Sequence, residues 1–236
     1  MKKVLIQIVC VLALLVAGRP AMADCVILLH GLARTPASME DLAVFLEERG
    51  YTVANVGYPS RKKPIEELAA PAIEDGLRQC PQETTVHFVT HSLGGILVRY
   101  YLDDNEIAQL GRVVMLTPPN QGSEIVDALK DVPGYEFLNG PSGQQLGTGP
   151  ESIPAQLGPV EFELGVIAGD KTIDPIGSQF LPNPDDGKVS VESTKVKGMN
   201  DFIQVSRSHA MIMQAPEVME LVVSFIETGE FIPVEP

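Results

Sequence analysis

The sequence lacks an apolar run long enough to cross a bilayer. The run from Val4 to Ala17 has about 14 residues, whereas a transmembrane helix needs about 20. Lys2 and Lys3 precede this run and Ala21-Met22-Ala23 follows it, an order typical of a secretory signal peptide. We therefore predict that residues 1–23 are a cleaved signal peptide rather than a membrane anchor, and that the mature protein is periplasmic or secreted. No cysteine stands at the cleavage site, which argues against a lipoprotein signal.

Basic residues are scarce. The chain has 17 Lys and Arg against 31 Asp and Glu, which gives a formal net charge of −14. Three of the basic residues and none of the acidic ones lie in residues 1–23, so the mature chain has about 14 basic residues and a net charge of about −17. A surface this acidic disfavours nucleic acid and anionic membranes as partners.

Cysteines are also few. The chain has 3, and Cys10 leaves with the predicted signal peptide. Cys25 and Cys80 remain, and an even pair in an exported chain indicates one disulfide. Two buried thiols are the alternative at this point.

Repeats, charge blocks and linkers are absent as well, so residues 24–236 are expected to form a single domain. Strand-like and helix-like stretches alternate along this domain, which predicts an α/β protein with a mostly parallel sheet of about six strands and helices on both faces. The expected strands are 25–29, 52–56, 86–91, 112–116, 162–168 and 202–205.

Three further segments carry local expectations. Ser38 and Asp41 have the spacing of a capping box at a helix start, and Pro71 should kink or divide the helix that begins at Pro64. Residues 131–159 are rich in Gly and Pro and have little periodicity. A loop of this length inside a compact domain is usually functional or disordered, so a cap or lid over the site is expected there.

The strongest chemical signal is Thr90-His91-Ser92-Leu93-Gly94, between a predicted strand and a predicted helix. It is a variant of the G-x-S-x-G nucleophile elbow, with Thr90 in place of the first glycine. Such a turn exposes the serine hydroxyl, and the helix N-terminus offers free N–H groups to a developing oxyanion. Ser92 is therefore a candidate nucleophile, and the alternative is that it only caps the helix.

A second signal is His30-Gly31-Leu32, directly after the first predicted strand. A glycine there lets the backbone turn so that the next N–H faces the serine. The N–H groups of Leu32 and Leu93 would then form an oxyanion hole.

The candidate base and acid follow from chain order, which in nucleophile-elbow enzymes is serine, acid, histidine. Only His209 of the four histidines lies after Ser92. Carboxylates after the fifth predicted strand offer two candidate pairs for the acid, and the position directly after that strand favours Asp170. The pairs are Asp170 with Asp174, and Asp185 with Asp186.

With these motifs the sequence resembles the compact bacterial lipases of the α/β-hydrolase superfamily, over nearly the whole mature chain. Thr117-Pro118-Pro119-Asn120-Gln121-Gly122-Ser123 is similar to the Pro-x-x-Gly-Ser stretch of such lipases. Their acid often lies in an Asp-Gly-x-Val segment some two dozen residues before the histidine, and Asp186-Gly187-Lys188-Val189 matches it. The resemblance thus implies an α/β-hydrolase fold and favours Asp186 over Asp170.

The resemblance has further implications. In this fold the strands that end at His30 and Ser92 are neighbours, which implies a Cys25–Cys80 disulfide at their other end. Calcium-binding members carry an Asp two residues after the histidine; Met211 stands there, so neither calcium nor any other metal or cofactor is expected.

The expected function is that of a serine carboxylic-ester hydrolase, which would act on small-molecule or lipid esters through an acyl-enzyme on Ser92. Tyr135, Phe137 and Leu138 would line an apolar acyl pocket under the cap. Two alternatives stay open: an acyltransferase with the same triad, and a non-catalytic binding protein on a hydrolase fold.

Overall fold

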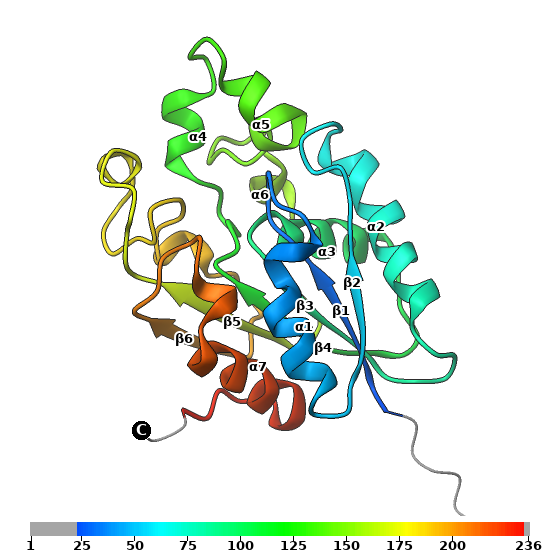
Figure 1. The fold of residues 1–236 in the computed structure, drawn as a ribbon. Coiled ribbons are helices and arrows are strands. Elements are labelled where there is room, and N and C mark those ends of the chain that lie inside the picture. The colour runs from blue at the N-terminus through cyan, green and yellow to red at the C-terminus, as the bar shows by residue number, and fades with distance from the viewer. Residues whose placement is uncertain (1–22, 234–236) are drawn as a thin grey trace, which may run out of the picture.

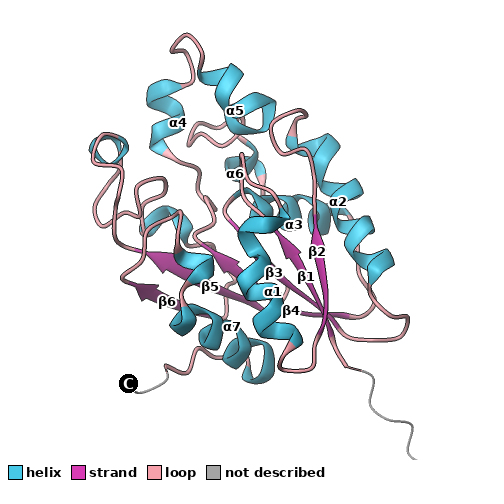
Figure 2. Cartoon of the chain, viewed as in Figure 1, coloured by secondary structure: helices cyan, strands magenta, loops and turns pink. Residues whose placement is uncertain are grey.

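The computed structural model describes residues 23–233, and a six-stranded sheet forms its centre (Figures 1 and 2). The sheet order is β2-β1-β3-β4-β5-β6, and every neighbouring pair is parallel. The α/β prediction and its mostly parallel six-stranded sheet are thus confirmed. The strands are β1 (Cys25–Leu29), β2 (Thr52–Val56), β3 (Val86–His91), β4 (Leu110–Leu116), β5 (Leu164–Gly169) and β6 (Asp201–Val205).

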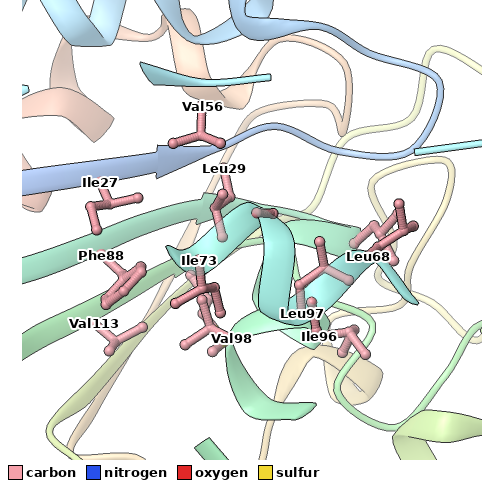
Figure 3. Close-up of a cluster of buried hydrophobic side chains, with 14 of the residues drawn as sticks. Ile27, Leu29, Val56, Leu68, Ile73, Phe88, Ile96, Leu97, Val98 and Val113 are labelled. Atoms are coloured by element: carbon pink, nitrogen blue, oxygen red, sulfur yellow. The ribbon is translucent and has the colours of Figure 1, made fainter. Parts of the chain in front are cut away.

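Helices cover both faces of the sheet, as expected, because alternate strand residues point to opposite sides. On one face Ile27, Leu29 and Phe88 pack against α2 and α3 (Figure 3). On the other face Val26 and Leu28 pack against α1 and α7. The helices are α1 (Glu40–Glu47), α2 (Ile65–Gln79), α3 (Leu93–Asp104), α4 (Glu124–Leu129), α5 (Tyr135–Gln144), α6 (Ile153–Gln156) and α7 (Pro216–Thr228).

Burial on both faces explains why β1 is a continuous apolar run. All five residues of β1 and all six of β3 are buried. Figure 3 shows the α2–α3 side of this core, where Ile73 of α2 lies beside Val98 of α3 and Leu68 of α2 lies near Leu97 of α3.

The predicted disulfide is present between Cys25, the first residue of β1, and Cys80, which directly follows α2, with a Cα–Cα distance of 5.7 Å. It ties the start of β1 to the chain that enters β3, at the end of the sheet opposite to Ser92.

The expected capping box at Ser38 was wrong, and the expected division of the helix at Pro71 does not occur. Ser38 lies in a 3₁₀ turn, Pro36–Met39, and its hydroxyl donates to the Thr35 carbonyl, so it does not cap α1. Helix α2 continues across Pro71 without a division. Pro71 and Glu67 are both exposed, so water can reach the carbonyl that proline leaves without a donor.

Residues 131–159 have more regular structure than their sequence indicates, because α5 and α6 lie within them. Figure 1 shows α4 and α5 standing beyond the edge of the sheet at which the strands end. The predicted signal peptide lies outside the described residues except for Ala23. Between residues 23 and 233, no helix combines the length and apolar character needed to cross a membrane.

Candidate active site

The candidate nucleophile, Ser92, lies between β3 and α3 with φ 52° and ψ −119°. This left-handed conformation is rare for a residue with a side chain and marks a strained turn. Gly94 permits the turn, because a Cβ there would lie 2.6 Å from the Leu29 carbonyl oxygen. The Ser92 N–H donates to Leu116 O at 2.9 Å, which anchors the turn to the end of β4.

Thr90, the departure from the usual elbow, is fully buried. Its side chain faces Gly95, where a Cβ would lie 3.2 Å from the Thr90 hydroxyl oxygen. A glycine at position 95 thus leaves room for the larger residue at position 90. The chain thus lacks the glycine two residues before the serine, but it has a second glycine, Gly95, three residues after it.

His209 and Asp186 are brought together from different loops. His209 Nδ1 lies 2.7 Å from Asp186 Oδ2, and the His209 N–H donates to the Asp186 carbonyl at 3.0 Å. The Asp186 side chain is fully buried, and that of His209 is 14% exposed. A buried carboxylate in this position fixes the ring and its Nδ1–H tautomer, which leaves Nε2 free to accept a proton.

The loop around Asp186 is shaped to hold its carboxylate. Oδ1 accepts from the N–H groups of Lys188 at 2.9 Å and Val189 at 2.8 Å. Gly187, between Asp186 and Lys188, has φ 96°, which a glycine adopts without strain. With Oδ1 occupied by two donors, only Oδ2 faces His209.

Asp170, the alternative acid, lies elsewhere. Its Oδ2 accepts from Gln204 Nε2 at 2.8 Å, between the end of β5 and strand β6. Of the acids weighed from the sequence, Asp186 is the one that contacts His209. Asp185 instead accepts from the Gly187 N–H, and Asp174 pairs with Lys188.

The loop after β1 carries the candidate oxyanion donors. Within residues 23–233, neither the N–H of Leu32 nor that of Leu93 donates to a backbone acceptor. Gly31 lies so close to the elbow that a Cβ there would be 3.2 Å from Ser92 Cβ. The loop is held by His30, whose ring stacks on Tyr58 with centroids 4.2 Å apart. Burial lowers the pKa of His30, which favours its neutral form.

Two contacts of His209 were not foreseen from the sequence. The Thr117 hydroxyl lies 3.2 Å from His209 Nδ1. Thr117 is fully buried with φ 45°, an outlier for a β-branched residue, and strain of this kind gathers at functional sites. His91 contacts the backbone of His209, as described below. Both residues lie in motifs that the sequence offered, but neither motif indicates a contact with residue 209.

A cavity of about 550 Å³ is lined by Ser92 and His209. Tyr135 and Leu138 of α5 line it, as predicted, but Phe137 does not: its side chain points to solvent and is 88% exposed. The larger aliphatic side chains of the remaining lining come mainly from the loop after β1, from α4 and from the segment after α5, and include Leu32, Ile125, Val126, Leu129 and Leu146. Within the described residues, no group of three or more His, Cys, Asp or Glu side chains could hold a metal ion.

Comparison with solved structures identifies the architecture. The mature form of Bacillus licheniformis lipase BlEst2 superposes with a TM-score of 0.68 at 18% identity, over 89% of this chain and 93% of that one. The chain has the α/β-hydrolase fold. A metagenomic carboxyl esterase matches with a TM-score of 0.66 at 18% identity, over 83% of this chain and 69% of that one.

The phospholipase PlaB from Legionella pneumophila, in complex with thio-NAD, matches with a TM-score of 0.64 at 19% identity, over 85% of this chain and 56% of that one. No family model and no curated protein matches the sequence. At these identities the similarity establishes the fold, and the chemistry must be argued from the site.

Proposed function

We propose that this protein is a serine carboxylic-ester hydrolase with Ser92 as nucleophile, His209 as base and Asp186 as acid. The observation that carries the proposal is the 2.7 Å contact between His209 Nδ1 and the buried Asp186 carboxylate, beside a serine on a strained elbow. A serine that only capped α3 would need neither the strain nor an oriented histidine that lines the same cavity. Ser92 also has no side-chain hydrogen bond to the helix it precedes.

In the proposed reaction the Ser92 hydroxyl attacks the ester carbonyl while His209 Nε2 accepts its proton. Asp186 stabilises the resulting imidazolium, and the N–H groups of Leu32 and Leu93 stabilise the oxyanion. The alcohol leaves with the proton from His209. Water then attacks the acyl-enzyme with His209 again as base. This step releases the carboxylic acid product and restores Ser92.

The cavity supports an ester with an apolar acyl chain. Its walls at α4 and α5 are mainly aliphatic, whereas the end at Ser92 and His209 is polar. An acyl chain could lie between these helices with its carbonyl at Ser92. Residues 131–159, which contain α5, would then act as a small cap whose inner side is formed by Tyr135 and Leu138.

We also propose that the protein is exported after cleavage of residues 1–23. The Cys25–Cys80 disulfide supports this, because such bonds persist in oxidising compartments.

The test is steady-state hydrolysis of p-nitrophenyl esters of increasing acyl length by the mature protein, with Ser92→Ala as control. We expect turnover that Ser92→Ala abolishes while its melting temperature stays unchanged. Turnover in Ser92→Ala equal to wild type, or a folded wild type that hydrolyses none of the esters, contradicts the proposal. An added alcohol that intercepts most of the acyl group would favour the acyltransferase alternative.

A further inference from the structure

His91 contacts both the loop that carries His209 and the loop that carries the Leu32 N–H, and the proposed reaction gives it no role. It directly precedes Ser92, and its side chain is 1% exposed. Its Nε2–H donates to the His209 carbonyl at 2.9 Å, across 118 residues of sequence. The two imidazole rings lie with centroids 4.8 Å apart, at 52° to one another.

The opposite edge of the same ring contacts residues 30–32, the loop after β1 that carries the Leu32 N–H (the oxyanion loop). A Cβ on Gly31 would lie 2.6 Å from His91 Nδ1, so the ring packs directly against the backbone at Gly31. Nδ1 is buried and has no hydrogen-bond partner among the described residues. One ring therefore separates the loop that presents the Leu32 N–H from the loop that presents His209.

The hydrogen-bonding pattern defines the form of the ring. Because Nε2 faces a carbonyl it must carry a proton, so Nδ1 in the neutral ring carries none. Burial lowers the pKa of His91 well below its ordinary value, and the neighbouring His209 lowers it further. A neutral His91 adds no charge beside His209 when that residue becomes an imidazolium.

We propose that His91 is a positioning residue, which holds the His209 loop at its working distance from the oxyanion loop by donating Nε2–H to the His209 carbonyl. This inference rests on the proposed function, since it assigns His91 a part in placing the base. The donor acts on the backbone of residue 209, while Asp186 orients its ring. His91 thus restrains the backbone of His209, and Asp186 restrains its side chain.

The first test compares three variants on an ester that the wild type hydrolyses. His91→Gln keeps a donor nitrogen the same number of bonds from Cα as Nε2. His91→Asn is the matched control, because its nitrogen lies one bond short, at the position of Nδ1. His91→Leu has no donor. A displacement of about 1 Å at a reacting group can cost about 100-fold in rate, so kcat should fall by roughly 10- to 100-fold in the Asn and Leu variants.

In the same comparison we expect KM to change little and His91→Gln to retain most of the wild-type kcat. A Leu variant with wild-type kcat would overturn the proposal. Equal impairment of the Gln and Leu variants would also overturn it, because it would assign the effect to packing alone.

A second measurement uses the unmodified protein and requires no activity. Nitrogen-15 NMR of the histidine side chains at neutral pH should show His91 protonated at Nε2 and unprotonated at Nδ1. The opposite tautomer, or a charged ring, would overturn the proposal even if all variants failed to fold. A wild type that shows the expected tautomer but hydrolyses no ester would instead count against the proposed function.

Discussion

Replacing Asp186 by Asn tests how the site orients its base. Asp186 Oδ1 accepts from two backbone N–H groups, those of Lys188 and Val189. In the Asn variant the carboxamide oxygen must take that position, because the NH₂ group cannot accept from a donor. The NH₂ group therefore turns toward His209 Nδ1, which must then accept. The proton moves to Nε2, the atom that needs to receive the proton of Ser92.

The expected cost of the wrong tautomer is about 10⁴-fold in kcat, the magnitude known for the same change in the Ser-His-Asp triad of serine proteases. Initial rates on a short-chain p-nitrophenyl ester give this value directly, with a thermal melt to establish folding. Asp170→Asn is the matched control and should retain wild-type activity, because Asp170 binds Gln204 and does not contact His209. Inactivation by Asp170→Asn together with an active Asp186→Asn variant would refute the assignment of the acid.

Three further predictions concern the disulfide, Thr117 and the buried histidines. The disulfide closes a separation of 55 residues, so reducing it should lower the free energy of unfolding by up to about 4 kcal/mol; an unchanged urea midpoint would contradict this. Thr117→Val removes the hydroxyl at His209 but keeps the branched shape, and should lower kcat by about five-fold, the cost of one hydrogen bond; wild-type kcat would assign the hydroxyl no role. Burial lowers the pKa of three histidines in the folded state. Below pH 6.5, the ordinary pKa of histidine, the unfolded state therefore binds more protons than the folded state, and the free energy of unfolding decreases as the pH is lowered. Urea unfolding at about pH 7.5 and about pH 5.5 measures this, and equal stability would contradict it. These histidines are His30, His87 and His91.

The parts of the fold that the sequence predicts well are those set by local pattern. Strands β1 and β3 have the bounds that the sequence predicts: β1 is an unbroken apolar run, and β3 is buried along its whole length although it carries His87, Thr90 and His91. The predicted strand ends were less accurate: β4 begins at Leu110 rather than at residue 112, and β5 begins at Leu164 rather than at residue 162. Strand ends depend on pairing with neighbours, which the sequence of one segment does not contain.

Chain order constrains part of the candidate site. Chain order singles out His209, but the choice between Asp170 and Asp186 depends on which loop reaches the histidine. Contacts of Thr117 and His91 with residue 209 join segments far apart in sequence and have no local signature. Phe137 was expected to line the acyl pocket together with Tyr135 and Leu138. It lies instead on the solvent side of α5, since that helix packs over the cavity through Tyr135 and Leu138.

The most direct test of the central claim is covalent labelling of Ser92. The mature protein is treated with a fluorophosphonate, and the adduct is located by peptide mass in the wild type and in Ser92→Ala and His209→Ala. The proposed mechanism predicts one adduct, on Ser92, that is lost without the serine and strongly reduced without the histidine. An adduct on another residue, or a folded wild type that remains unlabelled, would contradict an activated serine at this site.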